Sequence, residues 1–181
     1  IGHFAGGQSQ GGSSVAIGMN AAWNAQGGSS VAVGNASGNQ NQGAGCVAVG
    51  NHAGYNSQGT NCVGVGHNSG KVDQGNEAVA IGFQAGSADQ GGGSVAIGMS
   101  AAMNSQSTNS VAIGWYAAQN SQGSSSVAIG PFCGRYDQGI FSVAIGYDAG
   151  RDNQGDFAVA IGFTAGLTNQ ETGTFRVRKD S

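Results

Sequence analysis

Residues 94–109 read SVAIGMSAAMNSQSTN, and at Ser110 the chain begins SVAIG again. The same sixteen-residue unit continues in both directions from this stretch without an insertion. One glutamine of the unit recurs without a slip, at Gln10, Gln26, Gln42, Gln58, Gln74, Gln90, Gln106, Gln122, Gln138, Gln154 and Gln170. A single uninterrupted period indicates one repetitive architecture.

The period predicts the fold. It is shorter than helix-pair repeats, which need ~33 residues or more, and it fits one coil of a parallel β-solenoid stacked at ~4.8 Å. The V-A-I triplet predicts a strand that ends at the following glycine, and Asp73-Gln74-Gly75 and its equivalents predict a turn. We therefore expect an all-β solenoid of about eleven coils and roughly 50 Å over residues 1–170, followed by a terminating strand or tail over residues 171–181.

Alternation along the strand predicts which side chains are buried. Val15 and Ile17 point to one face and Ala16 to the other, and the larger pair is expected to form the core. The second face carries only small residues in this repeat, such as Ala16 and Ser14. This uniformity predicts a homo-oligomer packed through an Ala/Ser stripe. The recurring glutamines predict a structural ladder of stacked amides, and a glutamine-lined ligand surface is the alternative.

The composition excludes several classes of protein. Glycine supplies 36 of the 181 residues, and each glycine inside a helix costs roughly 1 kcal/mol relative to alanine. Collagen needs glycine at every third residue, and disordered chains combine low hydrophobicity with high net charge; here 39% of residues are hydrophobic and the net charge is −3. With six Lys and Arg in all, no basic stripe exists for nucleic acid. No apolar run reaches the ~20 residues needed for membrane insertion.

The motif S-V-A-I-G-x-x-A-G, as in residues 142–150 (SVAIGYDAG), resembles the head repeats of YadA-like trimeric autotransporter adhesins. With its Gln-Gly half, the unit is even more similar to sixteen-residue repeats of fibre proteins from bacteriophages and large DNA viruses. The resemblance covers residues 1–170 and implies a left-handed parallel β-roll in each chain and an intimate homotrimer. It also implies a virion-surface fibre that attaches to a host. The alternative is an adhesin head on a bacterial outer surface.

The repeat stops after residue 170, and residues 174–181 are expected to form one terminating strand. In the viral fibres, a strand like residues 174–181 often precedes a chaperone domain that cleaves itself off next to a serine. Ser181 then marks either such a processing site or an arbitrary boundary. Because the repeat is already in progress at Ile1, we expect the chain to be a piece of a longer protein.

Sequence variety concentrates at three positions of the repeat. Two are the residues after the strand glycine, and the third is the residue after the A-G pair of the S-V-A-I-G-x-x-A-G motif. We call one position of the repeat, followed through successive coils, a column. Large side chains occupy these three columns and are densest between Trp115 and Phe163. Exposed aromatic residues on a rigid scaffold are typical of sugar stacking and protein contact. We therefore predict that a host glycan or receptor binds at Trp115, Tyr116, Phe132, Arg135, Tyr136, Tyr147 and Arg151. Packing of these residues between chains is the alternative.

No catalytic, metal or cofactor site is predicted. Asp73 and Asp89 lie one coil apart, about 5 Å, near the carboxylate spacing of retaining glycosidases. Serine and asparagine fill the same column in other coils, so the position indicates a turn former. His3, His52 and His67 form no ligand cluster, and the threonines form no column that would support an ice-binding face.

The three cysteines are predicted to be free. Cys46 and Cys62 occupy one column in adjacent coils, close enough in principle for a disulfide. Serine and alanine fill that column elsewhere, and Cys133 replaces a corner alanine. All three therefore read as small buried residues, which suits assembly in a reducing cytoplasm.

Overall fold

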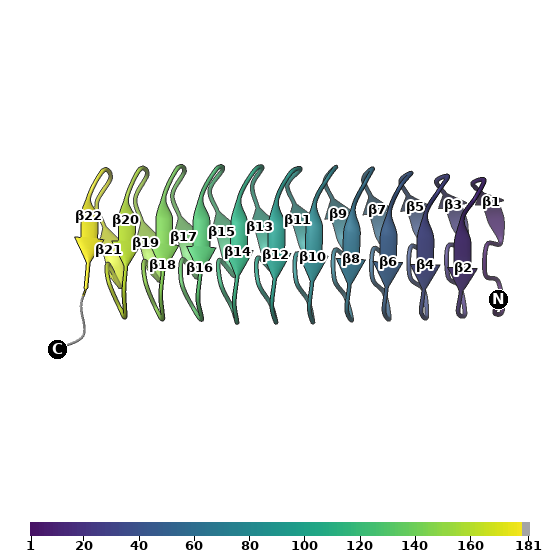
Figure 1. The fold of residues 1–181 in the computed structure, drawn as a ribbon, viewed down its shortest axis with the longest axis horizontal. Helices are drawn as coiled ribbons and strands as arrows, with labels where there is room; N and C mark the ends of the chain where they lie inside the picture. Colours follow the sequence, from purple (N-terminus) through teal and green to yellow (C-terminus); the bar gives the residue numbers. More distant parts are fainter. Residues whose placement is uncertain (179–181) are drawn as a thin grey trace.

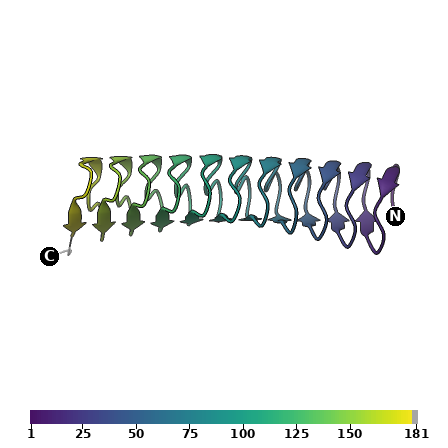
Figure 2. The same cartoon turned by 90° about the horizontal axis from the view of Figure 1, so that it is seen from above.

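The computed structural model describes residues 1–178, which form a rod of stacked coils (Figure 1). Each coil contributes one three-residue strand to each of two parallel eleven-stranded sheets. Figure 2 shows the two rows of strands facing each other along the rod. The all-β solenoid of about eleven coils predicted from the repeat is confirmed. The described residues include no helix long and apolar enough to cross a membrane.

The odd-numbered strands end on the repeating glutamine and form the first sheet: β1 (Gln8–Gln10), β3 (Asn24–Gln26), β5 (Gln40–Gln42), β7 (Asn56–Gln58), β9 (Val72–Gln74), β11 (Ala88–Gln90), β13 (Asn104–Gln106), β15 (Asn120–Gln122), β17 (Tyr136–Gln138), β19 (Asp152–Gln154) and β21 (Thr168–Gln170). The even-numbered strands form the second sheet: β2 (Val15–Ile17), β4 (Val31–Val33), β6 (Val47–Val49), β8 (Val63–Val65), β10 (Val79–Ile81), β12 (Val95–Ile97), β14 (Val111–Ile113), β16 (Val127–Ile129), β18 (Val143–Ile145), β20 (Val159–Ile161) and β22 (Phe175–Val177).

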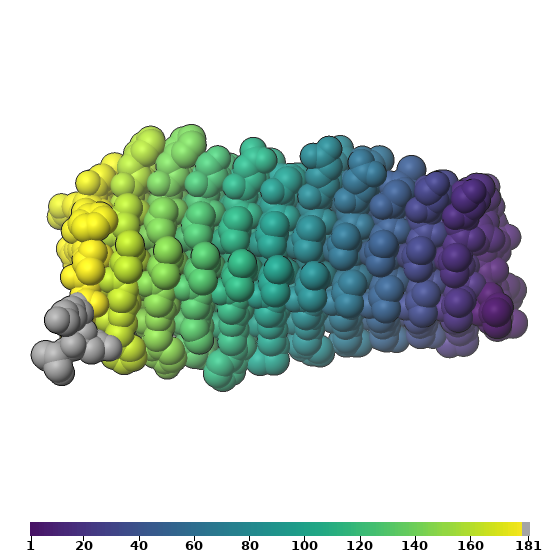
Figure 3. Space-filling model, viewed as in Figure 1, coloured from purple at the N-terminus to yellow at the C-terminus, as the bar shows by residue number. Residues whose placement is uncertain are grey.

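Successive coils stack in register. Val95 pairs with Val111 in the second sheet, and Gln90 pairs with Gln106 in the first. The corners are bonded in the same way, since the Gly98 amide donates to the Ile81 carbonyl at 2.8 Å. Each column of the repeat therefore becomes a row of side chains along the rod, and these rows are visible on the surface in Figure 3.

The segment before each Gln-Gly is a strand, and the turn predicted there is wrong. Asp73 is the central residue of β9, whose neighbours Val72 and Gln74 pair with β11. The φ of Asp73 is +49°, a left-handed conformation that Asp, Asn and Ser tolerate well. The turn-like composition thus reflects a local backbone conformation within a strand and not a reversal of the chain.

The inward and outward faces of the V-A-I strand are the reverse of those predicted. Ala32 and Ala96 are fully buried inside the coil, whereas Val15 and Ile17 are 43% and 40% exposed. Ser30, on the alanine side, is also fully buried. The prediction that Val15 and Ile17 form the core is therefore wrong. An oligomer cannot pack through the Ala/Ser stripe, because the coil itself already encloses that stripe.

Glutamine side chains span the interior and leave no room for larger aliphatic residues. Gln106 Nε2 reaches from β13 across to the Val95 carbonyl of β12 at 3.0 Å. The same nitrogen donates to Gln122 Oε1 at 2.9 Å, and Gln106 is only 1% exposed. The space beside these amides accommodates Ala, Ser and Cys, which explains why the inward columns contain little else.

The amides form a ladder that runs along the rod. Side-chain bonds from one glutamine to the next connect Gln26 to Gln42 and every successive pair from Gln58 to Gln170, at 2.9–3.2 Å. No such bond is made from Gln10 to Gln26 or from Gln42 to Gln58 among residues 1–178. The Oε1 atoms of Gln26 and Gln58 accordingly have no hydrogen-bond partner within the described chain.

The glycine after each V-A-I triplet is required by the backbone. Gly98 has a φ of +125°, and a Cβ there would lie 2.5 Å from the carbonyl oxygen of Gly114 in the next coil. This is one of five positive-φ columns in a coil. Between residues 95 and 110 they are Gly98, Ser100, Ala102, Ser105 and Asn109.

The three cysteines are free and fully buried. Cys46 Sγ accepts a bond from the Cys62 amide at 3.3 Å, much as the Ser30 hydroxyl accepts one from the Cys46 amide at 3.1 Å. Burial raises the pKa of the Cys133 thiol to about 12. The cysteines therefore occupy positions that serine and alanine fill in other coils.

The predicted tail contains one strand within the described range. β22 pairs in parallel with β20, placing Phe175 opposite Val159 and Val177 opposite Ile161. Residues 179–181 lie outside the described residues, and so does the predicted processing site at Ser181.

Candidate ligand-binding site

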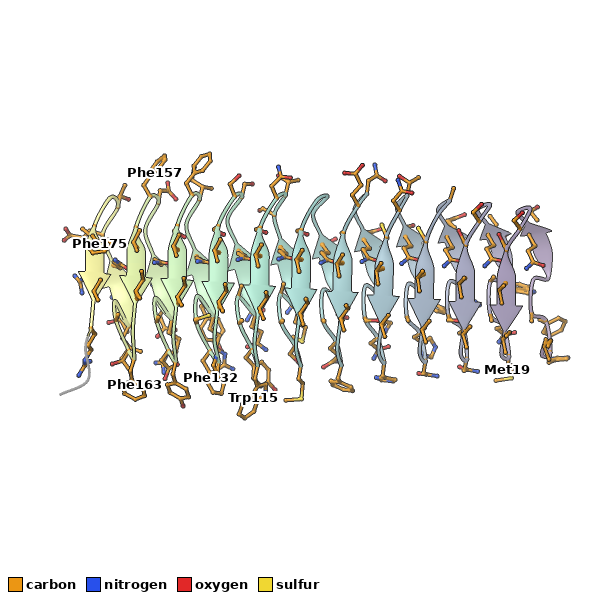
Figure 4. The ribbon with its side chains drawn as sticks, viewed as in Figure 1. Met19, Trp115, Phe132, Phe157, Phe163 and Phe175 are labelled. Atoms are coloured by element: carbon orange, nitrogen blue, oxygen red, sulfur yellow. The ribbon has the colours of Figure 1, made fainter. Side chains whose placement is uncertain are left out.

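Six of the seven predicted site residues lie in the corners that connect the second sheet to the first, and Tyr136 begins the following strand, β17. Trp115 and Tyr116 follow β14, Phe132 follows β16, and the remaining residues lie in the same or the next coil. Figure 4 shows Trp115, Phe132 and Phe163 along one edge of the rod. We call this surface the aromatic corner. It comprises Trp115, Tyr116, Phe132, Arg135, Tyr136, Tyr147, Arg151 and Phe163.

The rings of the aromatic corner form a continuous cluster. Phe132 lies at its centre, with ring centroids 4.9 Å from Trp115, 5.8 Å from Tyr116 and 5.8 Å from Tyr147. Tyr147 in turn stacks on Phe163 at 5.3 Å, with an interplanar angle of 13°. Trp115 is 47% exposed and Tyr147 44%. The structure thus brings predicted residues from successive coils into one partly exposed aromatic surface.

Two of these aromatic residues adopt a strained backbone conformation. The φ angles of Tyr116 and Phe132 are +54° and +58°, in the left-handed region that bulky side chains rarely occupy. Asn20 and Asn68 fill the same column elsewhere with similar φ values, and asparagine tolerates this conformation. The same φ recurs at this position in every coil from Phe4 to Thr164, so it belongs to the repeat and does not by itself mark a site.

Arg135 lies among three aromatic rings. Its guanidinium carbon is 5.0 Å from the ring centre of Tyr116, 5.3 Å from Phe132 and 4.8 Å from Tyr136. Its Nε donates to Gln119 Oε1, one coil earlier, at 2.8 Å. These distances are within the range of cation–π attraction, so the half-buried guanidinium is held in one orientation.

Arg151 lies one coil further along in the same column and has different partners. Its guanidinium contacts Asp152 Oδ2 at 3.1 Å and Asp148 Oδ1 at 3.7 Å. The hydrogen bond to Asp152 raises the pKa of Arg151. The positive charge of Arg151 is therefore balanced within its own coil.

The seven predicted site residues did not include four residues that contribute to this surface. Phe163 extends the aromatic stack, Gln119 orients Arg135, and Asp148 and Asp152 pair with Arg151. Gln119 lies one period before Arg135, so counting columns identifies it as a neighbour. Nothing in the pattern indicates that its amide accepts a bond from Arg135.

A second exposed aromatic pair lies on another edge of the rod. Phe141 and Phe157 stack at 5.3 Å with an interplanar angle of 14°, and they are 54% and 57% exposed. Figure 4 shows Phe157 on the edge opposite Phe132 and Phe163. The sequence analysis did not identify this pair, because Ser, Gly, Asn and Glu fill the same column in earlier coils and indicate a polar corner.

The outward face of the first sheet is polar. A shallow groove there is lined by side chains that include Ser105, Ser121, Asp137 and Asn153. Asp73 and Asp89 lie in the same exposed row of the rod.

Each of two histidines lies beside an aromatic ring. His52 lies 5.0 Å from Tyr55, and His67 stacks on Phe83 at 5.2 Å. Within residues 1–178, no group of three His, Cys, Asp or Glu side chains is arranged to hold a metal ion.

The outward face of the second sheet is apolar. Its two rows of side chains form what we call the valine–isoleucine stripe: Val15, Val31, Val47, Val63, Val79, Val95, Val111, Val127, Val143, Val159 and Phe175 in one row, and Ile17, Val33, Val49, Val65, Ile81, Ile97, Ile113, Ile129, Ile145, Ile161 and Val177 in the other. All are half-buried or exposed in the single chain. The stripe is roughly 7 Å wide and 50 Å long, from the spacing of residues along and between strands.

Comparison of the chain with models of known protein families, with curated proteins and with solved structures gave no match.

Proposed function

We propose that this chain is a segment of a virus or phage fibre, in which three copies pack side by side and display the aromatic corner to glycans on a host surface. The valine–isoleucine stripe carries the proposal. A contiguous exposed apolar surface rimmed by polar residues is typical of a protein–protein interface, and this one follows the whole rod. Covering it with further copies of the same chain removes it from water along its full length.

The number of copies and the biological setting come from the resemblance of the repeats to trimeric fibres. The Gln-Gly half of the unit favours a viral or phage fibre at the virion surface. The head of a bacterial trimeric adhesin is the alternative, because it shares the S-V-A-I-G motif. Phe141 and Phe157 each precede a stripe valine by two residues, so they border the proposed contact between chains.

The proposed mechanism is rigid display. The coils hold the aromatic corner on stacked strands, and three copies on one fibre multiply a weak contact through avidity. In this proposal the chain has no catalytic, metal or cofactor role, and it binds no nucleic acid and inserts into no membrane.

Light scattering coupled to size exclusion tests the assembly. The expected mass is three times the chain mass of 17.7 kDa. Ile113→Asp places a charge in the middle of the stripe and is expected to yield single chains that keep their β-sheet circular dichroism. Ser121→Asp is the matched control on the polar outward face, where Asp137 already fills the same column in the next coil. A wild-type mass of one chain would refute the trimer.

Glycan binding is tested separately, with the assembled protein on an array of oligosaccharides. Trp115→Ala and Tyr147→Ala each remove an exposed ring that lies beside the central Phe132. Each variant is expected to reduce binding, because it removes an exposed aromatic face on which a sugar ring could stack. Unchanged binding by both variants would exclude the aromatic corner as the site.

A further inference from the structure

Arg135 and Arg151 occupy the same column in neighbouring coils, but only one of them has a carboxylate partner. Arg151 has Asp148 three residues before it and Asp152 directly after it, and it contacts both. At the equivalent places around Arg135 the chain has Phe132 and Tyr136. Within residues 1–178, no carboxylate lies within 4.0 Å of the Arg135 guanidinium. Two aromatic rings thus replace the two acids that balance Arg151.

The aromatic rings orient Arg135 without using its terminal nitrogens. Gln119 accepts from Nε, and three ring faces surround the guanidinium carbon at 4.8–5.3 Å. Neither Nη atom donates a hydrogen bond to another residue of the described chain. A planar guanidinium with both Nη groups unengaged offers two parallel donors, which match the oxygens of a carboxylate or sulfate. Because the side chain is already held, binding an anion orders little further.

The rings beside Arg135 offer a surface for the rest of such a ligand. Trp115 and Tyr147 both contact Phe132, which lies under the guanidinium, and both are nearly half exposed. An apolar ring face next to a fixed cation suits a sugar that combines a C–H face with an acidic substituent.

We infer that Arg135 is a specificity-determining residue that binds the carboxylate or sulfate group of an acidic sugar, whose ring stacks on the exposed faces of Trp115 or Tyr147. This inference rests on the proposed glycan-binding function and deepens it. Arg151, with its charge already balanced, takes no part in recognising the anion.

The test compares matched oligosaccharides that differ only in a carboxylate, or only in a sulfate, with their neutral parents. Binding to the assembled wild type is expected to favour the acidic member about tenfold or more, as for one charged hydrogen-bonded pair. Arg135→Gln copies Gln119 of the preceding coil; it is expected to remove this preference, so that the acidic and neutral members bind alike. Lys71→Gln, in the same column four coils before Arg135 and outside the aromatic corner, is the matched control and is expected to retain the preference. Circular dichroism and mass verify that each variant folds and assembles.

The outcomes separate the inference from the function on which it rests. Equal binding of acidic and neutral members by the wild type, or an undiminished preference in Arg135→Gln, overturns the inference alone if Trp115→Ala still reduces binding. If the wild type binds no oligosaccharide, or if Trp115→Ala and Tyr147→Ala both bind fully, the inference and the proposed glycan-binding function are both overturned. The carboxylated and sulfated sets show which anion Arg135 prefers.

Discussion

The inward and outward columns of the coil differ sharply in how much they vary. At the inward centre of the V-A-I strand, Ala32 and its equivalents up to Ala160 are alanine, with one glycine at Gly64. The outward column that begins at Asn35 lies two residues after the end of the same strand. In these coils it holds Asn, His, Phe, Met, Trp, Pro and Tyr. The two columns are only three residues apart in sequence.

The difference shows that available volume limits the inward columns, whereas the outward corner accepts side chains of very different size and polarity. Inside, a glutamine amide and an alanine methyl fill the space between the sheets, so each coil constrains the next in the same way. Outside, a new side chain meets solvent, a neighbouring coil or another molecule. Substitutions on the inside should therefore change stability, whereas substitutions on the outside should change association or binding.

Gly98→Ala is expected to have the largest effect on stability. The φ of +125° is strained for alanine, and the new Cβ would lie 2.5 Å from the Gly114 carbonyl oxygen. Strain and steric overlap together predict a loss of about 3 kcal/mol or more in the free energy of unfolding, measured by urea denaturation. Gly28→Ala is the control, because its Cβ meets only an ordinary contact at 3.5 Å and Ala44 fills that column in the next coil. Equal midpoints for the two variants would contradict the geometry.

Ala112→Leu tests directly which face of the strand is inside. Ala112 is fully buried, and extra methylenes in a packed interior cost typically about 1–3 kcal/mol. We expect the upper end of that range, because the adjacent Gln122 amide is fixed at both ends. Thr108→Leu, at an exposed corner where Ile140 stands two coils later, is expected to be nearly neutral. If Ala112→Leu has the same denaturation midpoint as the wild type, the alanine face is an outer surface and not the interior of the coil.

Gln106→Leu removes one member of the amide ladder. It leaves the Val95 carbonyl and the Gln122 Oε1 without the donor that each now has, and unpaired buried polar groups cost about 1–3 kcal/mol. The expected loss is about 2 kcal/mol, and it should be the same at pH 5 and pH 8, because a neutral amide does not titrate. Gln40→Leu, at a half-buried position that Val72 fills two coils later, is the control. If both variants unfold at the same denaturant concentration, the ladder adds nothing to stability.

Cys62→Ser is expected to have the smallest effect, within about 0.5 kcal/mol. The Cys62 thiol donates to the Gly75 carbonyl at 3.0 Å, and the Ser30 hydroxyl makes the equivalent bond to Gly43 at 2.9 Å. Thermal unfolding of the two proteins should therefore superimpose. Cys62→Leu, which overfills the same site, provides the contrast and should unfold at a clearly lower temperature.

Much of the fold could be predicted from the sequence because the repeat is strict. The period fixed the coil length, the pairing register and the alternation of Val95, Ala96 and Ile97. The direction of that alternation could not be predicted from hydrophobicity, since a coil of sixteen residues is too narrow to enclose its own valines. The first sheet was not predicted, because Asp73 and its equivalents combine strand pairing with a left-handed φ, and only their preference for that φ is apparent in the sequence.

The candidate site was predictable as a location more than as a set of contacts. Column counting places Tyr116 next to Phe132 and Arg135 next to Arg151. It does not show that Asp148 and Asp152 turn toward Arg151 while rings surround Arg135, because that depends on rotamers. The Phe141–Phe157 pair was overlooked because its column otherwise holds small or polar residues, which indicate a corner.

The direction of the backbone hydrogen bonds has a mechanical consequence. Bonds between coils run along the rod, so tension applied between its ends acts on one coil interface at a time. A released coil of sixteen residues extends from about 5 Å to about 55 Å. Such a rod would lengthen by steps of about 50 Å under load, and single-molecule force spectroscopy should record a regular series of them. A fibre built this way would absorb a pull through extension before its attachment to a surface fails.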